Sequence, residues 1–526
     1  MRALDHEEVG TIFSVEATRF GLRLSAPRGK AGVALNTYLM TSHEDRHVLG
    51  VVQRAEDDRL WMNPVGEVVR GRFSRGVSQY PVPGVPVVRP DPRFLEALLG
   101  GGNRNRFSLG AVDVAGENVT IGLNPSLLFG RHLAIVGQSG AGKSWAVANL
   151  LQRTTESMPN AHVVVLDLHG EYWWKDREGK VHAAFKAGTA RGVDARQLEI
   201  PYWILTFAEL VDVLVDRRDP HASTQIAFLR ETVEYLRRKA NPGDSNSYIT
   251  VDTPVFFPLE GLFEAIKEAN DQMLDFGKTE GPLYGKFDEL LLRFESRMTD
   301  NRYDFLFKPK KRKSSASLES LLREFVGLGP RPAAVTVIDM SGIPFDVRPT
   351  VSAQVGRLAF EFNYWNPDRR GFPLFLVCEE AHAYVPREAG GPYEGARRSM
   401  NRIAREGRKY GVGLCVVSQR PRDVSETVLA QCGNFLCLRL TNPDDQRYVR
   451  QLVPEGERDL LEALPALRRG EVIALGEALD MPTRLQLYRP SPAPHSKDVD
   501  FKAGWTADAA TADVADIVDR WRWQRR

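Results

Sequence analysis

The sequence contains few cysteines, little net charge and no long apolar runs, and each of these absences argues against a class of protein. Only 4 cysteines occur among 526 residues, at Cys378, Cys415, Cys432 and Cys437, and none of them forms a C-x-x-C pair. This spacing predicts small buried thiols and argues against a disulfide framework or a zinc site. The formal net charge is only +2, so any surface that binds nucleic acid has to be local.

No segment has the length or composition of a membrane anchor. The sequence has no uninterrupted apolar run of about 18 residues, the length needed to cross a bilayer. Its first residues, MRALDHEEVG, lack the apolar stretch of a signal peptide. With 43% hydrophobic and 26% charged residues, the chain is expected to be a cytoplasmic globular protein with two or three domains and no membrane contact.

The spacing of apolar residues changes along the chain and indicates its organisation. Residues 8 to about 97 are short strand-like runs broken by glycine, proline and charged turns, which predicts a small β-barrel or sandwich. From about residue 119, apolar strands alternate with helices, a pattern typical of a mostly parallel, doubly wound α/β sheet. Residues from about 207 to 330 have apolar positions at helical spacing, so they predict a helical insertion within the α/β part.

A glycine-rich motif, GQSGAGKS, lies between the apolar strand HLAIV and a helix expected from Lys143 to about Glu156. It matches the P-loop G-x-x-x-x-G-K-[ST], whose backbone N–H groups surround nucleotide phosphates. Lys143 is expected to reach the β- and γ-phosphates, and the Ser144 hydroxyl to bind magnesium, so ATP and Mg²⁺ are the expected cofactors. The residues expected to bind the nucleotide are Gly137, Gln138, Ser139, Gly140, Ala141, Gly142, Lys143, Ser144 and Trp145.

Two adjacent carboxylates end the apolar strand PLFLVCEEAH, residues 373–382. This is the pattern of a Walker B element. Glu379 is expected to bind magnesium through its water shell, and Glu380 to act as the base for the water that attacks the γ-phosphate. Glu379 stands where many P-loop enzymes have aspartate.

A third apolar strand, VGLCVVSQRP, ends in the polar residues Ser418 and Gln419. Gln419 is the candidate sensor of the γ-phosphate, with an ordinary polar strand end as the alternative. The helix expected over residues 397–411 carries several arginines, of which Arg405 and Arg408 are the candidates for an arginine finger that completes a neighbour's site. A solvated basic face is the alternative for that helix, and Arg131 is a weaker candidate for the finger.

Three further polar segments have both a functional and a structural interpretation. Asp167, His169 and Glu171 follow a strand and could lie near the nucleotide or a subunit contact, or could form only a turn. The basic run KPKKRK, residues 308–313, could bind phosphates or be a solvated loop. The glycine-rich basic segment at 387–398 could move during hydrolysis and contact DNA.

Together these segments resemble the HerA-type ATPases of the FtsK/HerA superfamily. The resemblance covers about residues 8 to 490 and rests on the P-loop, VVVLDLHGEYWW, IPYWILTFAEL, VTVIDMSGIP, LVCEEAHAYVP, AREGRKYG, VVSQRP and the YPVPGVPV turn. Where the family often has DPHGEY, this chain has Leu168 in place of the proline, so the turn after that strand is expected to differ.

The resemblance implies a RecA-like P-loop core, an N-terminal HAS-like β-barrel and a homo-hexameric ring that threads double-stranded DNA. It also implies a partner, either a NurA-like nuclease or an antiphage effector. The expected division is the barrel over residues 1–100, ATPase core over 101–206 and 331–490, the helical insertion over 207–330, and a tail over 491–526 that could brace neighbouring subunits. Two functions stay open: a DNA-translocating motor, and an ATP-gated platform that activates a nuclease or NAD-consuming effector without processive translocation.

Overall fold

The computed structural model describes residues 7–522 except for short gaps. These are 28–31, 44, 101–104, 115–116, 173–182, 187–195, 198, 275–278, 330–331, 344, 346, 497–499 and 507–511. The chain divides into two compact units, one of residues 1–161, 377–387 and 401–496, the other of residues 162–376, 388–400 and 497–526. Among the described helices, none is both long and apolar enough to cross a membrane.

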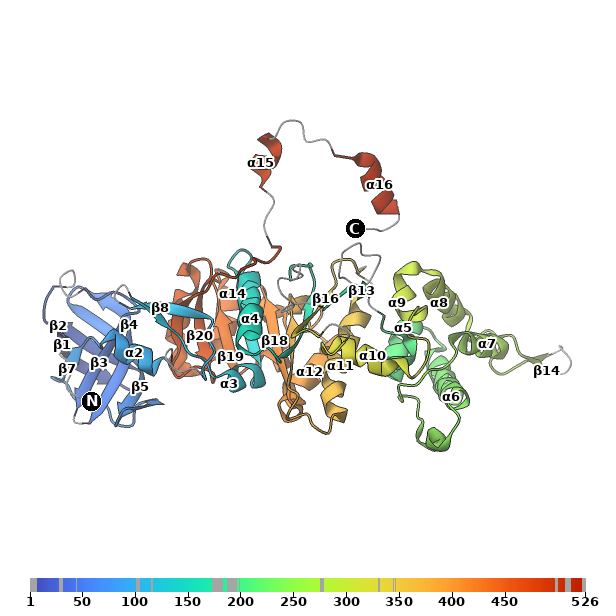
Figure 1. The fold of residues 1–526 in the computed structure, drawn as a ribbon, viewed down its shortest axis with the longest axis horizontal. Helices are drawn as coiled ribbons and strands as arrows, with labels where there is room; N and C mark the ends of the chain where they lie inside the picture. Colours follow the sequence, from blue (N-terminus) through green and yellow to red (C-terminus); the bar gives the residue numbers. More distant parts are fainter. Residues whose placement is uncertain are drawn as a thin grey trace. The chain divides into compact units, whose positions relative to one another are not determined.

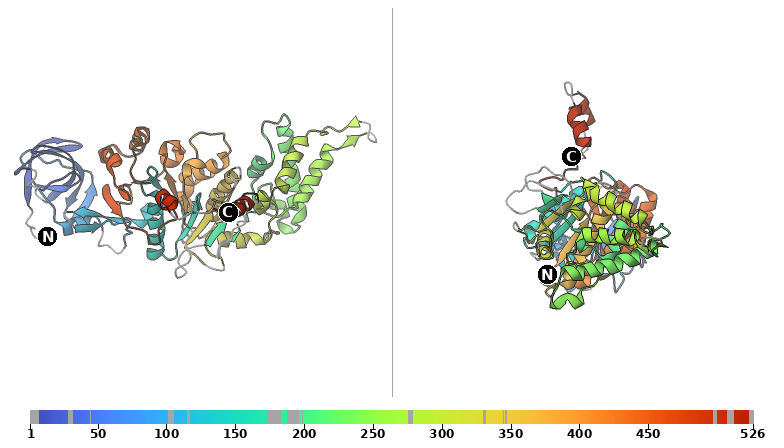
Figure 2. Two further views of the ribbon diagram at one scale, coloured as in Figure 1. Left: turned by 90° about the horizontal axis from the view of Figure 1, so that it is seen from above. Right: turned by 90° about the vertical axis from the view of Figure 1, so that its right-hand side faces the viewer.

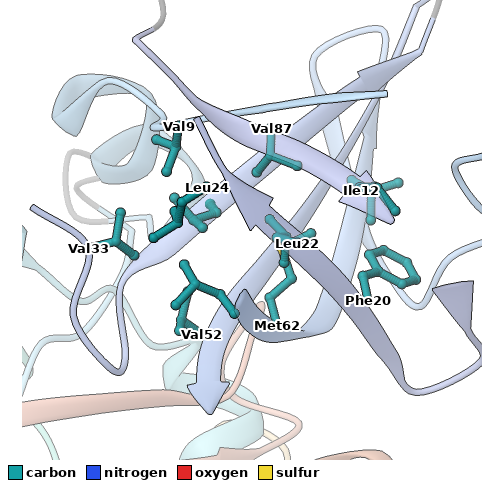
Figure 3. Packing of buried hydrophobic residues seen from close by; sticks show 12 residues of the cluster. Val9, Ile12, Phe20, Leu22, Leu24, Val33, Val52, Met62 and Val87 are labelled. Carbon is teal, nitrogen blue, oxygen red and sulfur yellow. The ribbon is translucent and has the colours of Figure 1, made fainter. Parts of the chain in front are cut away.

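The N-terminal part of the first unit is a closed antiparallel β-barrel. Its strands are β1 (Glu8–Glu16), β2 (Arg19–Leu24), β3 (Tyr38–His43), β4 (Arg46–Glu56), β5 (Arg59–Val69), β6 (Arg72–Arg75) and β7 (Pro86–Val88). They pair in the order β2-β1-β7-β3-β4-β5-β6, and β2 also pairs with β5, which closes the ring seen in Figure 2. Phe20, Leu22 and Leu24 alternate along β2, so the pleat turns all three into the core shown in Figure 3.

The rest of the first unit contains a mixed sheet with helices (Figure 1). Its strands are β8 (Gly110–Val114), β9 (Glu117–Thr120), β10 (Leu133–Val136), β18 (Val412–Ser418), β19 (Asn434–Cys437), β20 (Glu471–Gly476) and β21 (Thr483–Leu487). β10 pairs in parallel with β18 on one side and β19 on the other. From β19 the pairing continues antiparallel through β20, β21, β8 and β9. All residues of β10 and β18 are buried, which explains their uninterrupted apolar sequence.

Helices connect these strands, and polar caps and prolines set where several of them begin. They are α2 (Pro92–Leu98), α3 (Pro125–Gly130), α4 (Lys143–Ser157), α13 (Glu426–Leu429) and α14 (Pro443–Leu452). The Asn124 side chain caps α3 and the Asn442 side chain caps α14, each with a proline in the first turn that follows. The expected helix from Lys143 is confirmed and ends at Ser157.

The second unit combines parallel strands with the helical insertion. β11 (His162–Asp167), β12 (Ala183–Lys186), β13 (Arg196–Gln197) and β16 (Val335–Asp339) pair in parallel in the order β13-β12-β16-β11. β17 (Leu374–Cys378) follows α11 (Arg348–Trp365). The insertion holds α5 (Phe207–Leu214), α6 (Ala222–Ala240), α7 (Leu259–Asn270), the hairpin of β14 (Met273–Leu274) and β15 (Thr279–Glu280), α8 (Asp288–Thr299), α9 (Asp304–Phe307) and α10 (Ser317–Phe325). α15 (Phe501–Thr506) and α16 (Val514–Arg522) end the chain.

Two arginines with little exposed surface hold this insertion together. Arg357 on α11 donates through Nε to both carboxylate oxygens of Glu209, at 2.9 and 3.0 Å, and Glu209 also completes the capping box that starts α5. Arg237 on α6 is 1% exposed. Its guanidinium donates to the backbone carbonyls of Trp203, Leu205, Val251 and Thr253. Both arginines therefore satisfy polar groups that burial would otherwise leave unpaired.

The observed architecture confirms the predicted fold class, an α/β protein with an N-terminal β-barrel and a helical insertion. The prediction for the cysteines is also confirmed. All 4 are buried and none of them forms a disulfide, and burial raises the pKa of the Cys437 thiol to about 12. They therefore act as small apolar side chains.

Candidate active site

The P-loop follows β10 and is shaped by its glycines. Gly140 and Gly142 have φ of +74° and +109°, a region that residues with a Cβ rarely adopt. A Cβ on Gly142 would also come within 3.1 Å of the backbone nitrogen of Gly470. No side chain caps the N-terminus of α4 at Gly142, so the first N–H groups of this helix remain available for phosphate oxygens.

Neighbouring strands fix the start of the loop. The Gly137 N–H donates to the Ser418 carbonyl at 3.2 Å, and the Gln138 N–H donates to the Arg439 carbonyl at 2.9 Å. The Gln138 side chain accepts from the backbone N–H and hydroxyl of Thr441, at 3.0 and 2.6 Å. Lys143 is only 7% exposed, and its Nζ lies 3.4 Å from the Gln138 carbonyl. The lysine amine is therefore held within the loop.

The two predicted carboxylates lie at the end of β17. Glu379 is 2% exposed. Glu380 has φ 49° and ψ 47°, the left-handed conformation, which is uncommon for a residue with a side chain. Backbone strain of this kind concentrates at functional sites, and here it is observed at the residue predicted to be the catalytic base.

His382 connects Glu380 to the end of β18. Its Nδ1 lies 3.2 Å from Glu380 Oε2 and 3.3 Å from Ser418 Oγ. Ser418 Oγ also accepts the backbone N–H of Arg420 at 3.0 Å. Burial lowers the pKa of His382, an effect that the nearby Glu380 carboxylate opposes. Sequence reasoning did not assign this histidine, although it stands two residues after the base in E-E-A-H.

A polar cavity of about 290 Å³ opens beside the P-loop. The residues that line it are Gln138, Ser139, Gln419, Arg420, Arg422, Asp423, Leu440, Thr441, Asn442 and Asp445. Gln419 therefore lies with the first residues of the P-loop, as a γ-phosphate sensor would have to. The residues from α14 and its cap were not predicted, because nothing in their sequence distinguishes them from an ordinary helix start.

The two arginine-finger candidates lie elsewhere. Arg405 is in α12 (Glu394–Glu406) and Arg408 in the following 3-10 helix η5 (Gly407–Tyr410), both exposed and both before β18 begins at Val412. The P-loop follows β10, which is parallel to β18, so it lies at the opposite, carboxyl end of these strands. A seven-residue strand is about 23 Å long. The structure thus does not bring these arginines to the P-loop of their own chain.

The remaining polar segments mostly have structural contacts. The Asp167 carboxylate accepts the N–H groups of Gly170, Glu171 and Tyr172 at 2.8 to 3.0 Å, and burial raises its pKa to about 6. It therefore holds its own turn together.

Several other basic side chains that the sequence analysis considered are ion-paired. In the basic run at residues 308–313, Arg312 is buried and pairs with Glu199 and Glu324, whereas the lysines of the run are exposed. Arg398 pairs with Asp212 at 3.4 Å and Arg131 with Glu477 at 3.3 Å.

The oxygen donors fit a magnesium ion bound together with a nucleotide. Among the described residues there is no group of three or more His, Cys, Asp or Glu side chains that could hold a metal. Mg²⁺ is usually bound by one or two protein oxygens with phosphates and water. The Ser144 hydroxyl at the start of α4 and the buried Glu379 carboxylate are donors of this kind.

Comparison with known proteins supports the resemblance found in the sequence. Residues 107–357 match the family model of the central domain of helicase HerA. The DNA double-strand break repair helicase HerA of Saccharolobus solfataricus is 25% identical over 487 residues, 86% of this chain and 88% of the relative. A probable helicase of Methanocaldococcus jannaschii is 26% identical over 437 residues, 81% of this chain and 75% of the relative.

Solved structures with a similar arrangement have low sequence identity. VirB4 of Thermoanaerobacter pseudethanolicus is 17% identical with a TM-score of 0.47, covering 73% of this chain and 96% of that protein. The plasmid coupling protein TrwB in complex with the ATP analogue ADPNP is 16% identical with a TM-score of 0.45, covering 73% of this chain and 90% of that protein.

Proposed function

We propose that this chain, which resembles the HerA helicases in its central domain and is similar to such relatives over most of its length, is a ring-forming motor that uses ATP to translocate double-stranded DNA. We propose further that it works with a partner nuclease or effector in the processing of DNA ends or in antiphage defence. Several relatives are DNA double-strand break repair helicases by name, which favours duplex DNA as the substrate.

The residues at the end of β17 and in the P-loop support hydrolysis of the terminal phosphate bond. A water molecule attacks the γ-phosphorus, the bond to the bridging oxygen of ADP breaks, and Glu380 takes the proton of the water. Lys143 stabilises the charge that develops on the β- and γ-oxygens. When bound through Ser144 and Glu379, Mg²⁺ would withdraw charge from the same oxygens. We infer that Gln419, which lines the cavity with Gln138 and Ser139, senses the γ-phosphate. His382, whose Nδ1 lies 3.2 Å from Glu380 and 3.3 Å from Ser418, would orient the base.

One observation carries the proposal of a ring. The nucleotide groups lie at the carboxyl ends of β10 and β18, whereas Arg405 and Arg408 are exposed before β18 starts. We infer that an arginine at the opposite end of the strands acts on a neighbouring subunit. A head-to-tail contact of this kind closes into a ring, for which we propose six subunits.

Mixed rings test whether the arginine acts in trans. Lys143→Ala subunits keep their arginines, and Arg408→Ala subunits keep their P-loop. We expect each variant alone to be inactive and the mixture to regain part of the wild-type ATPase rate, because some junctions join an intact P-loop to an intact arginine. The measurement is steady-state phosphate release at several mixing ratios, with mixing verified by mass spectrometry of the intact rings.

A parallel series with Arg405→Ala decides between the two arginines. Arg323→Ala, which removes an exposed arginine of α10 that pairs with Glu319 at 2.8 Å, is the matched control and should retain activity. Verified mixed rings without recovery for either arginine would contradict the trans finger. A chain that remains monomeric with full ATPase activity would contradict the ring itself.

The alternative function is an ATP-gated platform that activates an attached enzyme without moving along DNA. It would use the same hydrolytic residues. The two functions differ in what accelerates hydrolysis, since a translocating motor responds to long duplex DNA and a platform responds to its partner protein alone.

A further inference from the structure

The indole of Trp145 lies close to the guanidinium groups of two arginines that are distant in the sequence. The guanidinium carbons of Arg469 and Arg489 each lie 5.1 Å from the centroid of the indole ring. Both arginines are exposed, and in the described part of the chain neither makes an ion pair. We propose that Trp145, Arg469 and Arg489 form the base-binding part of the ATP site. This inference rests on the proposed function.

Backbone hydrogen bonds fix Arg469 beside the P-loop. It stands in the turn before β20, and the N–H of the next residue, Gly470, donates to the Ala141 carbonyl at 3.0 Å. The Gly470 carbonyl accepts the N–H of Leu487 at 3.0 Å, which joins this turn to β21. Because Ala141 is itself a P-loop residue, the position of Arg469 is coupled to that of the phosphate-binding backbone.

Contacts with α4 hold the segment that carries Arg489. The preceding residue, Tyr488, lies under the Arg153 guanidinium, 5.3 Å from the ring centroid. The Gln152 side chain accepts the Ser491 N–H at 2.8 Å and donates to the Pro492 carbonyl at 2.7 Å. The segment that carries Arg489 is therefore held beside α4, the helix whose first turn carries Trp145.

The direction of the bound nucleotide places its base near this cluster. In a P-loop the lysine reaches the β- and γ-phosphates, and the backbone at the start of the helix faces the α- and β-phosphates. The nucleoside therefore leaves the loop past Ser144 and Trp145, away from Glu380 and Gln419. A guanidinium close to an indole adds a planar cation to an aromatic surface, and both kinds of group stack on purine bases.

A comparison of the affinities for ADP and for inorganic pyrophosphate distinguishes binding of the base from binding of the phosphates. Both are measured by isothermal titration calorimetry with Mg²⁺ on the full-length protein. We expect Trp145→Ala to weaken the binding of ADP about tenfold, since base stacking contributes about 1–3 kcal/mol. We expect the same loss of ADP affinity in the double variant Arg469→Ala/Arg489→Ala. Pyrophosphate affinity should change less than about twofold, because the P-loop is intact. Trp145→Phe keeps an aromatic ring and should retain ADP binding.

Arg468→Ala is the matched control, since this neighbouring arginine is exposed and pairs with Glu471 at 3.6 Å instead of stacking on Trp145. It should leave both affinities unchanged. The double arginine variant alters only exposed side chains, so it tests the proposal even if Trp145→Ala does not fold. Equal losses of affinity for ADP and for pyrophosphate, or no loss of affinity for either compound, would overturn the base-binding assignment. A wild-type protein that binds neither compound would instead contradict the P-loop assignment and the proposed function.

Discussion

Lys143→Ala is expected to lower the rate of ATP hydrolysis by about 1,000-fold, close to the limit of detection, which corresponds to the loss of about 4 kcal/mol of transition-state stabilisation. The amine is buried within the loop, 3.4 Å from the Gln138 carbonyl. The other residues of the loop are glycine, glutamine, serine and alanine, so none of them can supply the missing charge. Phosphate release at saturating ATP is the measurement.

Folding has to be unchanged for that result to be informative. Lys143 makes no salt bridge with any described residue, so we expect its removal to leave the thermal unfolding midpoint close to that of the wild type. Lys239→Ala, an exposed lysine on α6, is the control and should hydrolyse ATP at the wild-type rate. Wild-type turnover by Lys143→Ala would exclude the P-loop as the hydrolytic site.

Glu380→Gln is expected to keep ATP bound while turnover falls by about 100-fold or more, the usual contribution of a general base. Glutamine has the same shape and the same backbone preferences as glutamate, so the left-handed conformation at this position is retained. It cannot accept the proton of the attacking water. The measurements are the dissociation constant for ATP and single-turnover hydrolysis, with the exposed Glu388→Gln as the control.

The opposite pattern for Glu380→Gln would have a specific meaning. Loss of ATP binding together with turnover would indicate that Glu380 holds the metal and that the base is Glu379 or another residue. Unchanged turnover would remove Glu380 from the reaction. Either result would require a new assignment of the residues at the end of β17.

The sequence predicted those parts of the fold that depend on local pattern. Buried parallel strands such as β10 and β18 have uninterrupted apolar residues, and the P-loop is recognisable because its left-handed glycines and its lysine have few substitutes. The short strand-like runs of residues 8 to about 97 also predicted a small β-barrel or sandwich. The division at residues 100, 206, 330 and 490 stays a prediction.

Contacts between distant segments could not be predicted in the same way. His382 meets Ser418 across 36 positions of sequence, and Gln138 meets Thr441 across 303. Nothing in either segment specifies its partner, because the pairing depends on which strands are neighbours in the sheet. For Arg312 the local pattern was misleading. The basic run suggests a solvated loop, but the Arg312 side chain is buried and ion-paired. Charge in a sequence does not report burial.

The response of ATP hydrolysis to duplex length tests the central claim most directly. The assay compares equal base-pair concentrations of a twenty-base-pair duplex and a duplex of several thousand base pairs, with Glu380→Gln as the inactive control. We predict that the long duplex accelerates hydrolysis several-fold more than the short one. A translocating ring remains bound to a long duplex through many cycles of ATP hydrolysis. A rate that is independent of duplex length and that rises only when a partner protein is added would contradict translocation and establish the platform.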